Sequence, residues 1–208
     1  MRLDQLLRIV RLVTIVVVIA AIIAPAADLA ARGAFDPTRF FAYFTIQSNL
    51  IGVVTFGWLL AIGSGPRPPA LDRLRGAATL YLTITFFVVI FLLSGADVQL
   101  QMVWVDVVLH KVFPIVIVID WVLDPPRIRI TARDVVIWLI YPIGWTLLTV
   151  LRGAMDGWYP YPFLDPSNGG YGQVVIAVGA IALGFLVVGQ IVRAVGNVRG
   201  QGRSGFRG

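Results

Sequence analysis

Two short stretches of the sequence place polar side chains inside segments that are otherwise apolar. The first runs from Thr45 to Asn49 (TIQSN), and the second holds Asp106 and His110, which are four residues apart. Residues i and i+4 share one face of a helix, so the carboxylate can accept a hydrogen bond from the imidazole and stabilise its protonated form. A threonine hydroxyl beside such a pair completes a nucleophile, a base and an orienting group. We therefore take Thr45 and His110 as candidate catalytic residues and Asp106 as the orienting residue.

The other polar residues of the first stretch have two interpretations. Ser48 and Asn49 lie about one helical turn from Thr45, so either could donate a hydrogen bond to an oxyanion. Hydroxyl and amide side chains in transmembrane helices also bond to neighbouring helices and hold a bundle together. Asp106 and His110 have a similar structural alternative as a buried ion pair, although an ionisable side chain inside a membrane marks a functional site by default. Spacing alone leaves these interpretations open.

The sequence offers few residues that bind metals. It has no cysteine and a single histidine, His110. This excludes a thiolate nucleophile, an iron–sulfur site and a haem held by two imidazoles. A zinc ion would find only His110 and Asp106 close together, and a third ligand would have to come from a distant aspartate. We expect neither a metal nor another cofactor.

The composition places these residues in a membrane. Of the 208 residues, 58% are hydrophobic and only 13% are charged, and the mean hydropathy is +0.86. A helix needs roughly 17 to 25 residues to cross a hydrocarbon core of roughly 30 Å. Six apolar runs are long enough: 10–28, 39–62, 77–95, 102–123, 134–152 and 172–193. The sequence predicts an all-α integral membrane protein, with a bundle of six transmembrane helices in one domain (1–193) and a disordered basic cytoplasmic tail (194–208).

The arginines predict how the bundle is oriented. Lys and Arg near helix ends are retained on the cytoplasmic side. Thirteen arginines fall in the N-terminal segment, the second and fourth loops and the tail, against three in the other loops. Both termini are therefore predicted to be cytoplasmic, in a multi-pass protein of the cell inner (plasma) membrane. Because the basic residues are scattered over several loops, the net charge of +6 reflects topology, and we expect no nucleic-acid partner.

This orientation puts the two polar stretches at similar depths. The second and fourth predicted helices enter from the outer side near Phe40 and Met102. At a rise of 1.5 Å per residue, Thr45 lies roughly 7 Å and His110 roughly 12 Å below the outer surface. If the two helices are neighbours, we expect these side chains to meet in the outer half of the membrane.

The fifth loop, 153–171, is rich in aromatic residues, proline and glycine. Its prolines stiffen the chain and its aromatic rings suit the membrane interface, so an interfacial turn explains part of the pattern. The alternative is an ordered lid over a substrate site on the outer side. The candidate lid residues are Trp158, Tyr159, Tyr161, Phe163 and Asp165.

Three stretches, YFTIQSNL, DVVLHKVFP and YPYPFLDP, together resemble the androgen-induced and androgen-dependent transmembrane proteins and their bacterial relatives. The resemblance implies a multi-pass threonine hydrolase that cleaves fatty acid esters of hydroxy fatty acids. The family's nucleophile falls on Thr45, which follows Tyr43 and Phe44, and its histidine falls on His110. Around Lys111 the sequence departs from the animal members and is similar to the bacterial branch. The partner implied is a lipid or lipid-like ester held in the bilayer.

Two other classes of function stay open. Asp106, His110 and Lys111 could relay protons or bind an anion in a transporter or a proton-coupled binding protein. Such a protein needs a polar path across the membrane. The sequence offers only Asp120 near the cytoplasmic end, and we expect that residue to be structural. A non-catalytic membrane scaffold is the other alternative, and the sequence makes no prediction of oligomeric state.

Overall fold

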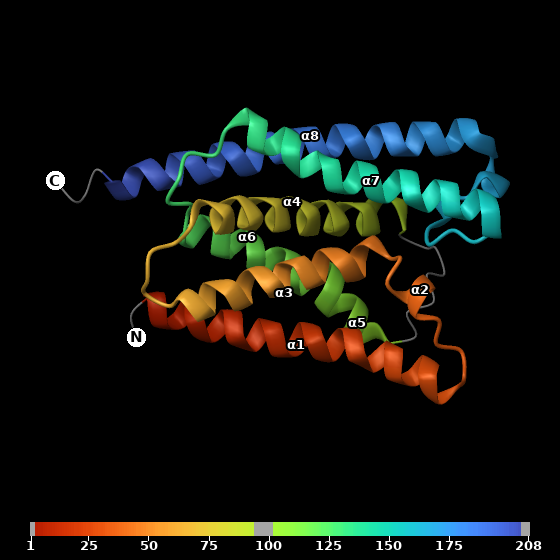
Figure 1. Ribbon diagram of the computed structural model, residues 1–208, viewed down its shortest axis with the longest axis horizontal. Helices are drawn as coiled ribbons and strands as arrows, with labels where there is room; N and C mark the ends of the chain where they lie inside the picture. Colours follow the sequence, from red (N-terminus) through yellow and green to blue (C-terminus); the bar gives the residue numbers. More distant parts are fainter. Residues whose placement is uncertain (1–2, 94–101, 205–208) are drawn as a thin grey trace.

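The computed structural model describes residues 3–93 and 102–204 as helices joined by turns, with no strand in these two ranges (Figure 1). The predicted all-α class is confirmed. In chain order the elements are α1 (Leu3–Ala31), α2 (Pro37–Phe40), α3 (Phe44–Ile62), α4 (Pro69–Leu92), α5 (Val103–Val107), the π-helical turn η1 (Val108–Val112), α6 (Phe113–Leu123), α7 (Ala132–Asp156), the 3₁₀ turns η2 (Pro162–Leu164) and η3 (Pro166–Asn168), and α8 (Gly170–Ser204).

Five helices are long and apolar enough to cross a membrane: α1, α3, α4, α7 and the Gly170–Gly200 part of α8. The chain is therefore a multi-pass membrane protein. The predicted run 102–123 is divided among α5, η1 and α6, and it is not one of the five. The end of the predicted run 77–95 falls outside the described residues.

Helix α4 lies at the centre of the bundle (Figure 1). It contacts α3 and α6 on one side and α7 and α8 on the other, while α1 packs against α3. Helix α3 packs closely against the start of α6 at Gly52. A Cβ atom at this position would lie 2.6 Å from Cζ of Phe113, so a larger side chain would clash. Helix α3, which carries Thr45, also contacts η1, which carries His110. The two segments are therefore neighbours, which is the condition under which the sequence predicts that these side chains meet.

The outer helices present apolar side chains outward. Val16 on α1, Leu148 on α7 and Ile176 on α8 are 62%, 71% and 74% exposed. In water such a surface would be costly, but in a bilayer it is the surface that lipid tails contact. The outward faces of α1, α7 and α8 therefore fit a lipid environment.

The second predicted run, 39–62, is not one continuous helix. The side chain of Asp36 caps α2, accepting hydrogen bonds from the N–H groups of Thr38 (2.8 Å) and Arg39 (3.2 Å). The chain then turns, and α3 begins only at Phe44. Thr45 is therefore the second residue of α3, whereas the predicted run places it near the start of a helix, about two turns in.

Helix α8 continues past residue 193 to Ser204, through a segment that the sequence predicts to be disordered. The side-chain amide of Asn197 donates to the carbonyl of Ile130 (2.8 Å) and accepts from its N–H (2.8 Å). Trp121 Nε1 also donates to the carbonyl of Val192 (3.0 Å). These bonds fix the end of α8 against the turn between α6 and α7. Residues 205–208 of the predicted tail lie outside the described residues.

Candidate active site

Thr45 lies at the positive end of a helix. The first N–H groups of an α-helix have no partner within it, and the helix dipole adds partial positive charge there. Tyr43, the residue before α3, makes no side-chain capping bond. The N–H of Thr45 instead donates to the hydroxyl oxygen of Tyr161 (3.2 Å). Negative charge that develops beside Thr45 would therefore be stabilised by the helix itself.

His110 is positioned by the π-helical turn η1. Pro114 has no N–H, so it cannot bond to the carbonyl of His110 four residues earlier. The N–H of Phe113 reaches back five residues to the carbonyl of Val108, which widens the turn. Such π turns inside α-helices occur frequently at functional sites. The widened turn brings the imidazole to a buried position that is only 5% exposed.

The side chains of Thr45, His110 and Asp106 form a continuous hydrogen-bonded chain, which we call the Thr–His–Asp chain. Thr45 Oγ1 lies 3.1 Å from His110 Nε2, and His110 Nδ1 lies 2.8 Å from Asp106 Oδ1. An ionised carboxylate only accepts, so Nδ1 carries the hydrogen and Nε2 can accept the hydroxyl hydrogen of Thr45. The structure thus places the three residues singled out by the sequence in the geometry of an activated nucleophile.

Asp106 also has a second partner. Its Oδ2 atom lies 3.4 Å from Nζ of Lys111, whose side chain is 47% exposed. A nearby cation favours the ionised carboxylate. Lys111 therefore supports Asp106 in its role as acceptor from His110.

Ser48 and Asn49 contact the backbone of Thr45. Ser48 Oγ donates to the carbonyl of Thr45 (3.1 Å), and Asn49 Nδ2 donates to the same carbonyl (2.8 Å) and to that of Leu109 (3.3 Å). Within the described residues, neither side chain forms a hydrogen bond to the Thr45 hydroxyl. Ser48 Oγ also lies 3.3 Å from Thr85 Oγ1 on α4, so Ser48 joins α3 to α4 and Asn49 joins it to η1. This is the structural interpretation that the sequence leaves open beside the oxyanion role.

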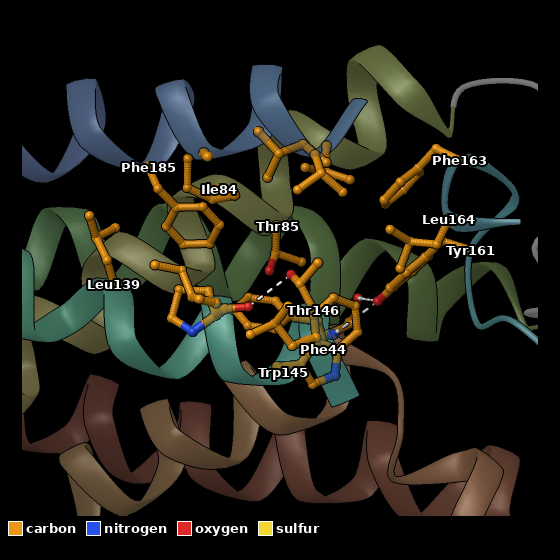
Figure 2. Close-up of a pocket in the computed structure, with 18 of the residues that line it drawn as sticks. Phe44, Ile84, Thr85, Leu139, Trp145, Thr146, Tyr161, Phe163, Leu164 and Phe185 are labelled. Carbon is orange, nitrogen blue, oxygen red and sulfur yellow. Dashed lines mark hydrogen bonds between the residues drawn. The ribbon is translucent and has the colours of Figure 1, made fainter. Parts of the chain in front are cut away.

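Thr45 opens onto an apolar cavity of about 290 Å³. The cavity lies among α3, α4, α7, α8 and the loop that follows α7, and Figure 2 shows Tyr161, Phe163 and Leu164 at one end with Leu139 and Phe185 toward the other. Its polar lining is limited to hydroxyl side chains, while its walls are aliphatic and aromatic. Such a cavity suits a hydrocarbon chain, with the Thr45 hydroxyl on its wall.

Tyr161 is the residue of the fifth loop that contacts the Thr45 hydroxyl. Its hydroxyl oxygen lies 3.3 Å from Thr45 Oγ1, and the residue is 5% exposed. The ring stacks on Phe163, with centroids 5.2 Å apart, and packs edge-on against Tyr43. Burial raises the pKa of Tyr161 to about 12, so the hydroxyl keeps its hydrogen at neutral pH. The sequence identifies Tyr161 as a lid residue but gives no signal of this contact with Thr45.

No family model, curated protein or solved structure matches this chain. Within residues 3–93 and 102–204, no three His, Asp or Glu side chains come together as metal ligands would. The function is therefore argued from the geometry of the Thr–His–Asp chain and its cavity.

The other predicted lid residues divide into two groups. Phe163 lines the cavity. Trp158 lies outside it, between the guanidinium groups of Arg39 and Arg152, which are 5.3 and 5.5 Å from its ring centroid. Tyr159 packs on Gly153, where no side chain would fit, and Asp165 Oδ1 caps η3 by accepting from the N–H of Ser167 (2.8 Å). Trp158, Tyr159 and Asp165 therefore shape the loop, while Tyr161 and Phe163 face the site.

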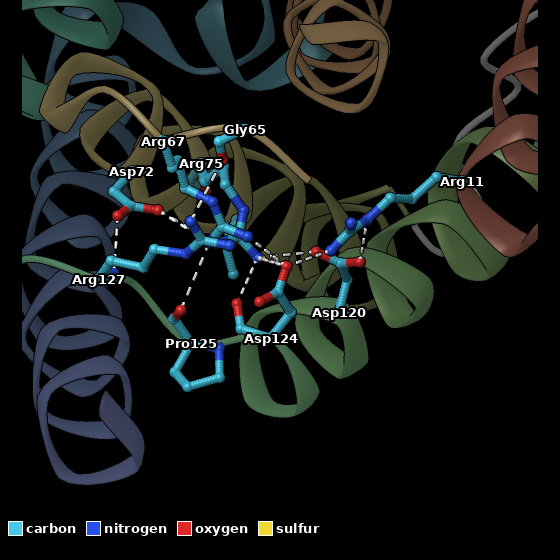
Figure 3. Close-up of polar contacts among 10 residues, drawn as sticks. Arg11, Gly65, Arg67, Asp72, Arg75, Asp120, Asp124, Pro125 and Arg127 are labelled. Carbon is cyan, nitrogen blue, oxygen red and sulfur yellow. Dashed lines mark hydrogen bonds and ion pairs between the residues drawn. The ribbon is translucent and has the colours of Figure 1, made fainter. Parts of the chain in front are cut away.

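A second buried polar group lies toward the opposite end of the bundle (Figure 3). Arg11 on α1 binds Asp120 and Asp124, each at 2.7 Å, and Arg75 on α4 binds Asp120 at 2.9 Å and the carbonyl of Asp124 at 2.6 Å. We call this group the arginine–aspartate cluster, and its members are Arg11, Arg67, Asp72, Arg75, Asp120 and Asp124.

The cluster extends to the loop before α4. Arg67 binds Asp124 at 2.6 Å and Asp72 at 3.1 Å, and Asp72 also accepts from the N–H of Arg127 at 2.7 Å. Burial raises the pKa of Asp124, but the guanidinium groups of Arg75, Arg67 and Arg11 outweigh this effect and hold that pKa well below its usual range. From the sequence, these arginines are predicted to have only a role in membrane topology. The signals that could have revealed the cluster are Asp120 and Asp124 four residues apart, and Asp72 three residues before Arg75.

Proposed function

We propose that this protein is a membrane-embedded hydrolase that cleaves lipid esters, with Thr45 as the nucleophile and His110 as the base. One observation carries the proposal: the Thr–His–Asp chain ends at Thr45, and Thr45 is among the residues that line an apolar cavity. A structural polar cluster would have no need of such a cavity. The likeness of three sequence stretches to the androgen-induced and androgen-dependent transmembrane hydrolases supports the same assignment.

The proposed reaction has two stages. Thr45 Oγ1 attacks the ester carbonyl carbon while its hydrogen passes to His110 Nε2, and Asp106 stabilises the imidazolium. When the tetrahedral intermediate collapses, the alcohol oxygen leaves and takes that proton, so the acyl group stays on Thr45. A water molecule then gives a proton to His110 and attacks the acyl carbonyl, which releases the acid and restores the hydroxyl.

The substrate class rests on the cavity as well as on the resemblance. Its aliphatic and aromatic walls would surround the hydrocarbon part of an ester with an environment about as apolar as the bilayer from which the ester comes. The fatty acid ester of a hydroxy fatty acid is the substrate type that we propose. Such a molecule is dissolved in the bilayer, so we propose that it enters sideways from the outer leaflet.

We also propose six membrane crossings, with both termini in the cytoplasm of a cell whose inner (plasma) membrane holds the protein. In Figure 1 the start of α1 and the end of α8 lie at the same end of the bundle, and this supports an even number of crossings. The segment formed by α5, η1 and α6 supplies the sixth. The excess of arginines at this end of the bundle supports its assignment to the cytoplasmic side.

A fluorophosphonate probe with a long alkyl chain tests the nucleophile without knowledge of the natural substrate. Purified protein in detergent is treated with the probe and weighed intact by mass spectrometry. We expect wild type to gain one probe adduct and Thr45→Ala and His110→Ala to gain none. Thr55→Ala is the matched control, because Thr55 lies on the same helix and its hydroxyl donates to the carbonyl of Ile51 in that helix (2.7 Å).

The opposite result would overturn the proposal. If wild type stays unlabelled while all variants melt like wild type, Thr45 is not an activated nucleophile. A scaffold role would then be favoured, unless transport is observed.

A proton-coupled transporter is the second candidate, because the arginine–aspartate cluster supplies a second buried polar group near the other end of the bundle. The charged groups of this cluster bind one another, which argues against an open proton path through it. Proton flux into reconstituted vesicles that persists in Thr45→Ala would favour transport over hydrolysis.

A further inference from the structure

We infer that Tyr161 is a further catalytic residue, whose hydroxyl donates to the oxyanion that forms when Thr45 attacks the ester. The inference rests on the proposed function and adds the group that stabilises its transition state. It starts from the two contacts that join Tyr161 to Thr45, one to the backbone N–H at 3.2 Å and one to Oγ1 at 3.3 Å. No other hydroxyl group bonds to Thr45 Oγ1 within the described parts of the chain.

The donors around Thr45 can be assigned one by one. Ser48 and Asn49 direct their donors to the Thr45 carbonyl, so both are engaged with the backbone. His110 Nε2 accepts the hydrogen of Thr45 Oγ1 and has none of its own before the reaction. The N–H of Thr45 donates to the Tyr161 oxygen, which directs the hydrogen of Tyr161 away from that N–H and toward Thr45 Oγ1 and the cavity. Tyr161 is therefore the donor best placed for the oxyanion.

The reaction itself frees this donor. Before attack, the Tyr161 O–H donates to a lone pair of Thr45 Oγ1. When the Oγ1–carbon bond forms, that lone pair is used and the carbonyl oxygen gains the negative charge. The hydrogen bond of Tyr161 then passes to the stronger acceptor, the oxyanion, and no covalent bond of Tyr161 breaks. When the intermediate collapses, the bond returns to the neutral oxygen.

Packing holds the hydroxyl in place for this role. The Tyr161 ring lies between Phe163 on one face, Tyr43 at an edge, with centroids 5.7 Å apart, and Trp145, whose centroid is 5.9 Å away. A ring fixed on several sides keeps its hydroxyl oriented before the reaction, which is the condition for electrostatic preorganisation. The stiff loop that carries η2 thus contributes a reacting group as well as a wall of the cavity.

Tyr161→Phe tests the inference because it removes only the hydroxyl and keeps the ring. The rate of labelling by the long-chain fluorophosphonate is measured against probe concentration, which separates the maximal rate of adduct formation from the concentration that gives half of it. We expect the maximal rate to fall about 100- to 1000-fold, as for the loss of one oxyanion donor, with little change in the half-saturating concentration. Tyr159→Phe, in the same loop but outside the cavity, should label like wild type.

Two other outcomes are distinguishable. If wild type labels and Tyr161→Phe labels at a maximal rate within about threefold of it, Tyr161 has no catalytic role and the proposed hydrolase stands. A rise in the half-saturating concentration alone, or a lower melting temperature with an unchanged maximal rate, overturns the inference in the same way, because packing alone would produce those effects. If wild type itself does not label, the proposed function fails and the role of Tyr161 fails with it.

Discussion

The Thr–His–Asp chain and the arginine–aspartate cluster both bury polar side chains in an apolar bundle, but they differ in what the last polar atom faces. In the cluster, three arginines and three aspartates bind one another and backbone carbonyls. In the Thr–His–Asp chain, Thr45 lines a cavity that could hold another molecule. Charged groups that pair with one another suit a structural role. A hydrogen-bonded chain that ends beside a cavity suits a reaction with a bound molecule.

The difference predicts opposite responses to mutation. Removal of one member of a buried ion pair leaves its partner charged and unpaired, which costs more than the pair contributes. Removal of the Thr45 hydroxyl leaves neutral neighbours. Variants of the cluster should therefore lower stability, and variants of the Thr–His–Asp chain should lower activity in a protein that stays folded.

The largest effect on activity is expected for Thr45→Ala. Loss of the nucleophile should lower kcat for hydrolysis of a long-chain p-nitrophenyl ester by about 10⁴-fold or more. The melting temperature should fall by no more than several degrees, because the two hydrogen bonds that Thr45 Oγ1 loses are to neutral partners and contribute about 1 kcal/mol each. Both quantities are measured on the same detergent-purified sample. A large loss of stability with retained turnover would reverse the roles assigned to the two regions.

Asp106→Asn should have the next largest effect. Asparagine can donate to His110 Nδ1 and so favour the tautomer that cannot accept from Thr45, which should lower kcat by roughly 10²- to 10⁴-fold with a small change in KM. Steady-state kinetics with the same ester measure both constants. Lys111→Met is the control. The Lys111 side chain is 47% exposed and pairs with Asp106 Oδ2, while His110 binds the other oxygen, so kcat should fall less than about tenfold.

Arg75→Met should separate the two regions most clearly. It keeps a long side chain but leaves Asp120 without one of its two buried partners, so the free energy of unfolding should fall by about 3 to 5 kcal/mol. Thermal melts of the detergent-solubilised protein measure this change. Arg73→Met is the matched control, since the Arg73 side chain is 50% exposed and its pair with Asp134 should contribute no more than about 1 kcal/mol.

Val88→Phe should have the smallest effect of the four and should depend on the substrate. Val88 lines the cavity, so a larger side chain there would occupy space that an acyl chain needs. We expect kcat/KM for a long-chain ester to fall about tenfold while that for an acetate ester changes little. Val175→Phe is the control, because Val175 lies on α8 and is 69% exposed. Equal losses on both esters would mean that the acyl chain lies elsewhere.

The sequence predicted the pair of Asp106 and His110 and similar depths for Thr45 and His110, but it left open whether Thr45 and His110 are in contact. Asp106 and His110 are one helical turn apart, and the depth of Thr45 follows from the orientation of the helices. It did not predict the break before Phe44, because FFAYF is as apolar as the helix that follows it. The turn depends on Asp36 as a cap and on tertiary contacts of the outer loops.

The contacts made by residues far apart in the chain were the hardest to predict. Tyr161 lies 116 positions from Thr45, and Arg11 lies 109 positions from Asp120. Nothing in local periodicity links such pairs. The positive-inside rule already explained where the arginines lie in the sequence. Their second role, as buried partners of aspartate, was therefore not predicted.

The π-helical turn η1 has a consequence for how the chain can tolerate insertion and deletion. A π turn contains one residue more than an α-helical turn, and each residue of a helix corresponds to a rotation of about 100°. Deletion of a single residue from Val108–Val112 would therefore rotate Asp106 on one side of the turn relative to Asp120 on the other. Either Asp106 or Asp120 could then keep its partners, but not both. The number of residues between these two aspartates is therefore constrained by the contacts at both ends of the bundle.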